Sequence, residues 1–274
     1  MAGADRAPDR ARVRRLPPRP LVLSLLDFVQ TPARQAAVLE DTSHRPWPVP
    51  ERSWLQAQTW DHLLFAHWRV DLDSLRRLVP EPLPLDTFDG SAWLGITPFR
   101  ITGLRLHGLP QLPLVSSFLE LNVRTYATID DKPGIWFFSL DAESALAVEA
   151  AKRAYRLPYH RARMSATRRD EWVDYRSERE GAGFDASYRP VGAVEAPTRG
   201  TLEYFLTERY CLYTVHDGAV HRAEIHHPLW PLQPAEAELR ENTMSPVALE
   251  GDPLLHYSER QDVVIWPLER LQPL

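Results

Sequence analysis

The chain has 274 residues, of which 44% are hydrophobic and 25% charged, and its formal net charge is -5. This is the balance of an ordinary globular chain, and it provides no global positive field, so we expect no nucleic-acid partner. A single cysteine, Cys211, excludes an internal disulfide and any zinc site built on two thiolates.

The first 44 residues differ in composition from the rest of the chain. Arginines alternate with prolines through residue 20, and such a segment buries too little apolar surface to offset its ordering entropy. We therefore predict a loosely ordered arm over residues 1–44 and one domain over 45–274, with 22–39 still able to dock as a short helix. The apolar run at 21–26 is far below the roughly 20 residues of a membrane helix, so no membrane span is expected.

Helices are expected to be few because 25 prolines interrupt the chain. Pattern and end signals predict helices over 72–79, over 142–156 with Asp141 as a candidate N-cap, and over 234–241 with proline in the first turn.

Most of the remaining chain reads as strand, with turn sequences such as Asp130-Asp131-Lys132-Pro133-Gly134 between the runs. The expected strands cover 62–70, 92–102, 117–129, 134–140, 159–167, 171–179, 201–215, 219–226 and 263–267. This spacing favours an antiparallel meander, sandwich or barrel, a mainly β fold with a few flanking helices.

Alternation along these strands separates an apolar face from a polar one. Between 119 and 124, the odd positions are apolar, whereas Glu120, Asn122 and Arg124 share the opposite face. The simplest interpretation is a strand whose polar side meets water. The alternative is a polar interior closed by a sheet whose apolar side is covered from outside.

The second interpretation gains support because polar faces of the same kind recur. Their residues mix arginine, histidine, tyrosine and carboxylate rather than lysine and glutamate, a mixture that can pair bidentately in a confined space. The additional candidates are His67, Arg69, Tyr159, Arg161, Arg163 and Glu208. We expect them to face a ligand cavity inside a barrel.

Several ordered blocks of the sequence resemble the YqjF-like family of uncharacterised proteins (domain of unknown function 2071). The resemblance covers roughly residues 45–268. It is carried by the blocks Trp60-Asp61-His62-Leu63-Leu64-Phe65-Ala66-His67-Trp68, Phe88-Asp89-Gly90-Ser91-Ala92-Trp93, Glu120-Leu121-Asn122-Val123-Arg124-Thr125-Tyr126, Trp136-Phe137-Phe138-Ser139-Leu140-Asp141, Leu157-Pro158-Tyr159 and Leu206-Thr207-Glu208-Arg209-Tyr210.

That family is similar to acetoacetate decarboxylases, and this implies a conical antiparallel β-barrel around a polar channel. In those enzymes a lysine forms a Schiff base with a keto substrate and a glutamate orients it; Glu120 looks like that glutamate. The place expected for the lysine holds Leu157-Pro158-Tyr159-His160-Arg161, and the chain has only Lys132 and Lys152. An arginine does not deprotonate to attack a carbonyl, so imine-type decarboxylation is not expected. Lys152 follows Glu149 by three residues, as in a surface helix pair.

Metal and cofactor chemistry find little support in the sequence. His62 and His67, like His216, His221 and His226, recur every five residues, and this spacing alternates the faces of a strand. Glycine-rich phosphate loops and known metalloprotease or hydrolase motifs are absent from the sequence. We therefore expect neither a metal nor a cofactor.

The preferred hypothesis is a cytoplasmic barrel that binds a small organic acid or carbonyl compound, with lyase- or isomerase-like chemistry left open. Arg69, Arg124, Arg161 and Arg163 would clamp a carboxylate with help from Asn122 and Glu208, Glu120 would act as acid or base, and Tyr159 or His67 would orient the reacting group. The alternative is a non-enzymatic barrel that acts through a partner protein. A cavity of about 300 Å³ or more favours a ligand over this scaffold. A homo-oligomer is left open.

Overall fold

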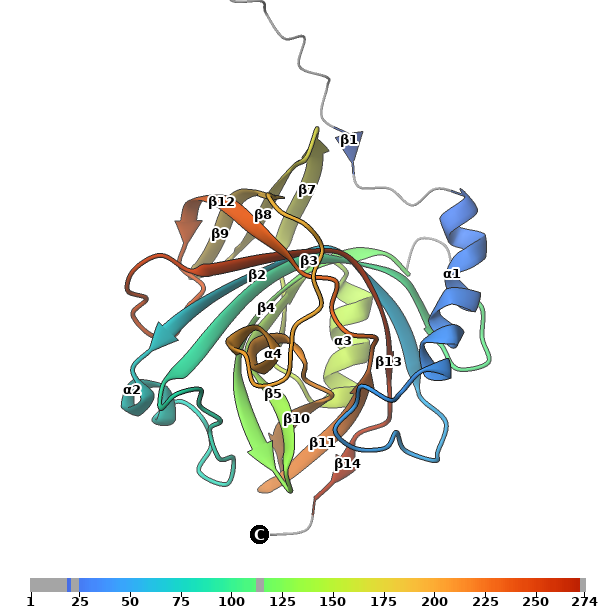
Figure 1. Ribbon diagram of the computed structural model, residues 1–274, viewed down its shortest axis with the longest axis horizontal. Helices are drawn as coiled ribbons and strands as arrows, with labels where there is room; N and C mark the ends of the chain where they lie inside the picture. The colour runs from blue at the N-terminus through green and yellow to red at the C-terminus, as the bar shows by residue number, and fades with distance from the viewer. Residues whose placement is uncertain (1–18, 21–24, 112–115, 272–274) are drawn as a thin grey trace, which may run out of the picture.

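The computed structural model describes residues 19–20, 25–111 and 116–271 (Figure 1). The fold is mainly β: strands make up 51% of the described residues and helices 15%. The strands form one sheet in the order β1-β7-β8-β9-β12-β13-β2-β3-β4-β5-β10-β11-β14, and β11 also pairs with β13. The strands from β13 to β11 therefore form a closed ring.

The ring strands are long and mostly antiparallel. They are β2 (Gln56–Val70), β3 (Ala92–Leu106), β4 (Phe118–Ile129), β5 (Lys132–Ala142), β10 (Cys211–His216), β11 (Ala219–His226) and β13 (Leu254–Ile265). The pairing of β5 with β10 is parallel, as is that of β5 with the short β6 (Tyr159–Arg161). The sequence predicted an antiparallel sheet, and this prediction is wrong at β5. The helix α3 (Ala145–Tyr155) connects β5 to β6, so that the two strands run in the same direction.

The other strands continue the sheet over the outside of the ring. They are β7 (Arg163–Arg169), β8 (Trp172–Arg179), β9 (Ala182–Pro190) and β12 (Gln233–Asn242), with β1 (Arg19–Pro20) and β14 (Glu269–Arg270) as short additions. Leu119, Leu121 and Val123 of β4 pack into one core with Val173 and Phe184 of this layer. The apolar face of β4 is thus covered from outside, and its polar face is left for the interior of the ring.

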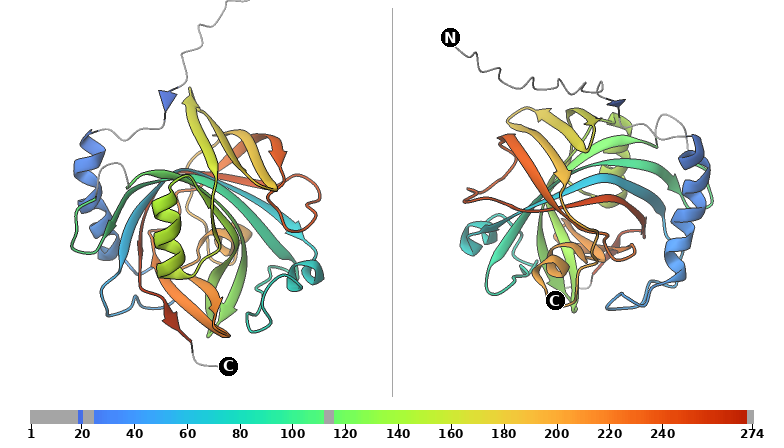
Figure 2. Two further views of the ribbon diagram at one scale, coloured as in Figure 1. Left: turned by 180° about the vertical axis from the view of Figure 1, so that it is seen from behind. Right: turned by 45° about the horizontal axis from the view of Figure 1, so that its top comes forward.

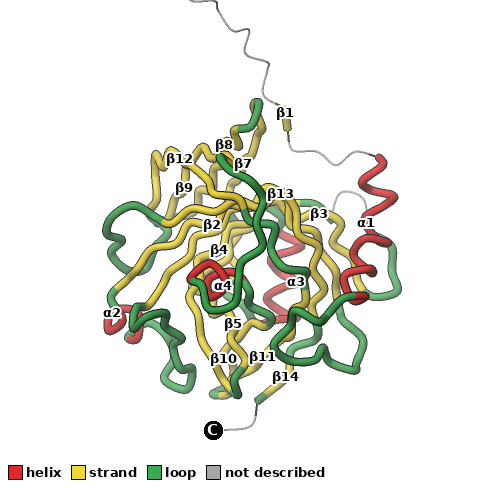
Figure 3. The backbone as a smooth tube through the Cα atoms, in the orientation of Figure 1, coloured by secondary structure: helices red, strands yellow, loops and turns green. Residues whose placement is uncertain are grey.

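Short helices flank the ring: α1 (Leu25–Ala37), the 3₁₀ turn η1 (Val38–Glu40), α2 (Leu72–Arg76), α3 (Ala145–Tyr155) and α4 (Leu202–Thr207). In Figure 1, α4 lies toward the viewer and α3 lies behind the strands, and the reversed view of Figure 2 brings α3 to the front. The tube of Figure 3 shows the same arrangement, with α1 and α2 at the sides of the strands and α4 in front of them. No helix in the described part of the chain is long and apolar enough to cross a membrane.

Part of the predicted arm is docked on the ring. Within α1, Thr31 and Gln35 are fully buried, and Gln35 Nε2 donates to the carbonyl of Gly103 at 3.0 Å. A Cβ at Gly103 would lie 2.4 Å from the Thr31 methyl group, so glycine permits this close approach. The expectation of loose order is therefore wrong for residues 25–40, where a helix within the alternative range 22–39 is found. Residues 1–18 lie outside the described residues.

The predicted helix over 234–241 is wrong, because these residues belong to β12, which pairs with β9. Ala235, Ala237 and Leu239 pack on the core while glutamates and Arg240 alternate with them. This is the period of a strand, and it outweighs the helix-start signal of proline.

Two other predicted segments are divided. The strand expected over 201–215 begins as α4, capped by Thr201, whose side chain accepts from Tyr204 N, and becomes β10 only at Cys211. The strand expected over 159–167 breaks at Ala162 into β6 and β7. The helix predicted over 142–156 is α3, and its N-cap is Ser144 rather than Asp141, which lies in β5.

Candidate functional site

A small cavity lies inside the ring, and every ring strand contributes to its wall. Its volume is about 50 Å³. The lining residues are Gln56, Gln58, Trp60, Leu63, Thr97, Phe99, Glu120, Asn122, Arg124, Ile135, Phe137, Leu140, Tyr155, Leu157, Tyr159, Leu212, Ile225 and Ile265. The space suits a few water molecules or a small group, and it is well below the roughly 300–1,000 Å³ of ordinary ligand pockets.

Glu120 projects into this cavity from β4 and is 4% exposed. Burial raises its pKa to about 8, although a hydrogen bond from the Tyr159 hydroxyl at 3.0 Å acts in the opposite direction. Burial also raises the pKa of Tyr159 well above its ordinary value, with the carboxyl of Glu120 adding to the effect. Near pH 7 the cavity therefore contains a protonated carboxyl group, able to donate a proton or a hydrogen bond.

Arg124 follows Glu120 by four residues on the same face of β4 and is 5% exposed. Its Nη2 donates to the carbonyl of Leu206 in α4 at 3.2 Å, and its guanidinium lies 5.2 Å from the ring centroid of Phe65. Its Nε has no hydrogen-bond partner, and among the described residues Arg124 has no carboxylate in ion-pair range. Burial lowers the pKa of Arg124, but an arginine remains charged at neutral pH.

Gly95 of β3 makes room for Arg124 and for its neighbour His67. A Cβ at position 95 would lie 2.9 Å from His67 Cδ2 and 3.3 Å from Arg124 Cγ. The absence of a side chain on the middle strand thus lets two bulky side chains from β2 and β4 approach each other.

His67 is completely buried but does not line the cavity. Its Nε2 lies 2.7 Å from the hydroxyl of Tyr126, and that hydroxyl donates to the carbonyl of Leu206 at 2.9 Å. The Tyr126 hydroxyl has one proton, and it donates this proton to the Leu206 carbonyl. The hydroxyl oxygen therefore accepts from His67, whose own proton is on Nε2. His67 Nδ1 is left without a hydrogen-bond partner. Burial, and next the charge of Arg124, hold the pKa of His67 well below its ordinary value. His67 thus contacts the residues around Arg124 in its neutral form.

Asn122 lies between Glu120 and Arg124 on the polar face of β4. The Thr97 hydroxyl from β3 donates to its side-chain oxygen, and this bond fixes the orientation of the amide. The structure therefore brings together four of the predicted site residues, Glu120, Asn122, Arg124 and Tyr159.

Three of the predicted arginines are outside the cavity. Arg69, Arg161 and Arg163 are exposed; Arg163 pairs with Glu178 at 2.9 Å, and Arg69 lies 5.9 Å from the ring centroid of Trp93. The inward clustering of these three side chains was predicted incorrectly. The chain leaves the ring at Ala162, so the alternation of β6 does not extend into β7, and β2 carries Arg69 to its exposed end.

Glu208 is buried in a separate polar cluster and does not line the cavity. Its Oε1 accepts from Trp230 N at 2.9 Å, and its Oε2 accepts from the hydroxyl of Tyr210. Burial raises the pKa of Glu208 to about 7, with the Trp230 and Tyr210 hydrogen bonds opposing the rise. The predicted role of Glu208 in clamping a ligand is not supported by this position.

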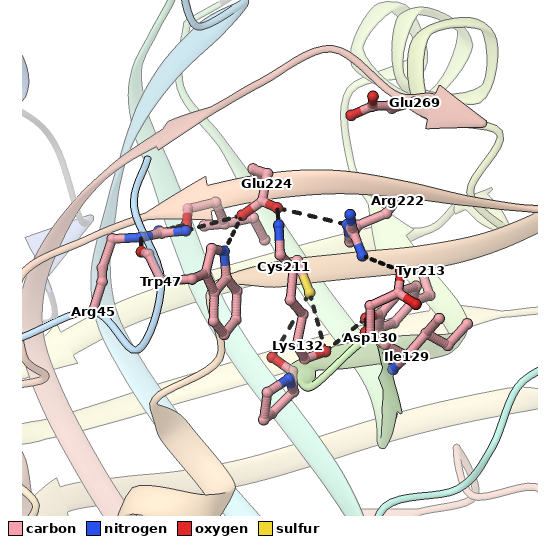
Figure 4. Close-up of polar contacts among 12 residues, drawn as sticks. Arg45, Trp47, Ile129, Asp130, Lys132, Cys211, Tyr213, Arg222, Glu224 and Glu269 are labelled. Atoms are coloured by element: carbon pink, nitrogen blue, oxygen red, sulfur yellow. Dashed lines mark hydrogen bonds and ion pairs between the residues drawn. The ribbon is translucent and has the colours of Figure 1, made fainter. Parts of the chain in front are cut away.

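Neither lysine faces the cavity. Lys152 is exposed on α3, from which Tyr155 is the cavity-lining residue. Lys132 Nζ forms an ion pair with Glu224 at 2.8 Å, and Glu224 is also held by Arg45 at 2.9 Å and by the indole of Trp47 at 2.7 Å (Figure 4). This Glu224 cluster includes Arg222, whose Nε lies 3.6 Å from Glu224.

The sequence did not identify the apolar part of the cavity wall. Phe137, Tyr155 and Leu157 read as ordinary core residues, and only the closure of the ring shows which of them border empty space. In the described part of the chain, no cluster of three or more histidine, cysteine, aspartate or glutamate side chains is arranged to hold a metal ion.

The fold and the interior place this chain among mainly β proteins of the acetoacetate decarboxylase-like fold. A solved structure of the enduracididine biosynthesis enzyme MppR complexed with pyruvate superposes with a TM-score of 0.59 at 11% identity, covering 84% of this chain and 94% of that one. An acetoacetate decarboxylase-like enzyme from Sphingomonas wittichii RW1 gives a TM-score of 0.57 at 14% identity over 85% of this chain and 99% of that one. At these identities the likeness shows the fold alone.

The sequence comparisons define the family more narrowly. The pattern of the family described as "Uncharacterized conserved protein", domain of unknown function 2071, matches residues 57–262. The uncharacterized protein YqjF of Bacillus subtilis (strain 168) is 47% identical over 229 residues, covering 81% of this chain and 95% of YqjF. The chain belongs to this family.

Proposed function

We propose that the protein binds a small organic acid inside the ring, with its carboxylate at Arg124 and its reacting group beside Glu120. The observation that carries this proposal is the charge pattern of the cavity. A buried guanidinium has no carboxylate partner among the described residues, and the cavity's own carboxyl group has a pKa of about 8.

An anionic ligand would complete the interactions of Arg124. Removing a charge from water is strongly unfavourable unless an opposite charge or several hydrogen bonds replace the lost hydration. In the described structure, Arg124 has the Leu206 carbonyl as acceptor, the side chain of Tyr126 as a further polar partner, and the ring of Phe65 nearby. A carboxylate that accepts from Arg124, whose Nε has no hydrogen-bond partner, would supply the missing charge and fix the position of the ligand.

Glu120 is suited to act as a general acid on the bound molecule. Its proton can be donated to a carbonyl or enolate oxygen, because a pKa of about 8 keeps the group protonated at neutral pH. Tyr159 donates to Oε2 and so holds the carboxyl group in place. The proposed chemistry is therefore proton transfer next to a carbonyl group, without an imine, since neither lysine lines the cavity.

The fold relatives agree with this choice of ligand. The MppR structure contains pyruvate, a small keto acid, in a protein of the same fold. We propose that the ring of this chain is likewise a conical barrel that encloses its ligand.

One observation favours the non-enzymatic alternative. The cavity of about 50 Å³ is smaller than the roughly 300 Å³ that distinguishes a ligand pocket from a packed interior. A scaffold whose polar interior serves only rigidity would have such a volume. A bound acid must therefore be small, or side chains of the wall must move to admit it.

Calorimetric titration with pyruvate and with lactate tests the proposal. We expect binding to the unmodified protein and a loss of affinity of about 10- to 150-fold in Arg124→Met, the equivalent of one hydrogen bond to a charged group. The matched control is Arg163→Met, which removes an exposed arginine and should leave the affinity unchanged.

The same titration separates the two candidate functions. Absence of binding by keto and hydroxy acids, or equal affinity in Arg124→Met and the unmodified protein, would support the scaffold. For a catalysed reaction, Glu120→Gln should retain binding while losing turnover, and turnover in the unmodified protein should decline above about pH 8 as Glu120 loses its proton.

A further inference from the structure

A larger cleft lies on the other side of part of the cavity wall. Its volume is about 300 Å³. Its lining comes from β5, β10 and the segments that follow α2 and α3: Leu78, Trp136, Phe137, Phe138, Arg156, Leu157, Pro158, Tyr213, Thr214 and Val215. The function proposed above involves the inner cavity and assigns no role to this outer cleft.

Two residues, Phe137 and Leu157, line both the outer cleft and the inner cavity. They are 8% and 7% exposed, so their side chains fill the space between the two hollows. Phe137 is also the register partner of Arg124 across β4 and β5, next to a bulge in the pairing. A group that passes Phe137 would therefore arrive close to the guanidinium of Arg124.

The backbone on both sides of Leu157 is held by hydrogen bonds. The carbonyl of Arg156 accepts from the Thr214 hydroxyl at 2.9 Å, and the carbonyl of Pro158 accepts from Leu140 N at 3.0 Å. Passage between the hollows would thus require rotation of the Phe137 and Leu157 side chains rather than movement of the chain.

We infer that the outer cleft is a binding site for the incoming ligand, that the ligand passes from it to the inner cavity between Phe137 and Leu157, and that Arg156 selects organic anions there. Arg156 is exposed, and among the described residues it has no ion-pair partner. It has a left-handed backbone conformation, with φ of 54°, at the end of α3. The choice of anions rests on the proposed function, whereas the passage itself does not.

The chemistry of the cleft supports a small acid with an apolar part. The partly exposed side chains of Trp136 and Phe138 offer apolar surface, and Arg156 is the cationic group of the cleft lining. A positive group at the mouth of an apolar cleft raises the local concentration of anions in a chain whose net charge is -5.

Labelling of a cysteine placed in the inner cavity tests the passage without any knowledge of the natural ligand. Thr97→Cys introduces a thiol at the cavity wall, and Leu212→Cys provides a second position if the first variant does not fold. The probes are three methanethiosulfonates: the neutral methyl, the anionic 2-sulfonatoethyl and the cationic 2-(trimethylammonium)ethyl reagents. The thiolate displaces methanesulfinate and forms a mixed disulfide. The native Cys211 is a slow background because burial raises its pKa to about 12.

In the Thr97→Cys background, adding Phe137→Ala should speed labelling by the neutral reagent about tenfold, the factor expected when a side-chain rotation is removed from the barrier. Phe138→Ala is the matched control, because Phe138 lines only the outer cleft and should leave the rate unchanged. Equal rates in Phe137→Ala, Leu157→Ala and the parent would overturn the passage.

Arg156→Glu should lower the ratio of anionic to cationic labelling rates by about tenfold at low salt. Arg240→Glu changes an exposed arginine on β12, a strand that contributes no residue to the cleft lining, and should leave the ratio unchanged. An unchanged ratio in Arg156→Glu would overturn the selection of anions. The labelling rates are measured without any organic acid. The test of the passage and of anion selection therefore remains valid even if pyruvate does not bind to the protein.

Discussion

The inner cavity and the Glu224 cluster handle buried charge in opposite ways. In the Glu224 cluster, one buried carboxylate lies within 2.9 Å of Arg45, 2.8 Å of Lys132 and 3.6 Å of Arg222. In the cavity, Arg124 has no carboxylate in ion-pair range among the described residues, and Glu120 is held by a tyrosine. Figure 4 shows how closely the cations surround Glu224.

The difference indicates what each region does. A buried carboxylate surrounded by cations is a closed set of interactions that connects the segment before β2 to β5 and β11, and it leaves nothing for a ligand. The cavity instead keeps a cation and a protonated acid four residues apart on one strand. Such a separation is unfavourable for folding, and it is the arrangement that the proposed binding of an organic acid requires.

The largest expected effect is on the Glu224 cluster. Glu224→Gln leaves the cations without their carboxylate, and we expect a loss of about 3–5 kcal/mol in the free energy of unfolding. Urea unfolding at pH 7 measures it. Glu269→Gln is the control, because its partner Arg52 is 3.1 Å away at the surface and such pairs contribute about 0–1 kcal/mol. Equal effects of the two substitutions would remove the distinction between the cluster and the surface.

The next effect concerns pH and Glu120. Because the folded-state pKa of about 8 lies above the ordinary glutamate pKa of 4.5, the unfolded chain releases this proton first as the pH rises. Between about pH 4.5 and 8, Glu120 therefore lowers stability by up to about 1.4 kcal/mol per pH unit, and no further loss follows above pH 8.

Comparison with Glu120→Gln isolates this contribution. The amide does not titrate, so the stability of the variant relative to the unmodified protein should rise from pH 5 to pH 8. Glu208 titrates with the same sign but is present in both proteins, so it cancels from the difference. Parallel stability curves would mean that Glu120 is ionised in the folded protein, contrary to the proposed acid role.

Substitution of Arg124 should change the free energy of unfolding less than substitution of Glu224 does, and any change should be a gain in stability. Arg124→Met replaces a buried cation that has no carboxylate partner by an apolar side chain of similar length. We expect stability to stay the same or to rise by about 1 kcal/mol, since apolar replacement of buried ionic groups is often neutral or stabilising. Thermal unfolding of the ligand-free protein measures it. A loss of several kcal/mol would show that Arg124 is a structural cation like those around Glu224.

The alternation of residues 119–124 predicted which side chains share each face of β4, whereas the choice of a polar interior over a water-facing strand came from the recurrence of such faces on other strands. The odd positions face the outer layer and the even positions face the cavity, because a strand has only two faces and both are buried here. The same reasoning failed for Arg163, because alternation has no meaning across the break at Ala162, and for Arg161, which is exposed as the last residue of β6. Local patterns do not reveal where a chain leaves one sheet layer for another.

Long-range closure of the ring was also beyond the sequence. The pairing of β11 with β13 and the parallel pairing of β5 with β10 decide which side chains meet. Phe137 and Leu157 are apolar in sequence and core-like in burial, and only these pairings place them between two hollows. Residue type and alternation thus led to the part of the cavity lining on β4 and to Tyr159, but not to its apolar walls, and they wrongly included His67 and Glu208.

The smallest effect is expected at Lys152, which lies in neither region of the comparison. This lysine is exposed on α3, so Lys152→Ala should change stability by less than about 0.5 kcal/mol and leave pyruvate binding unchanged. Borohydride reduction in the presence of pyruvate, followed by mass spectrometry, examines the chemistry directly. We expect no specific adduct, because Lys152 is away from the cavity and Lys132 is paired with Glu224. An adduct that forms on the folded protein but not on the denatured chain would restore imine chemistry, and with it a different role for Glu120.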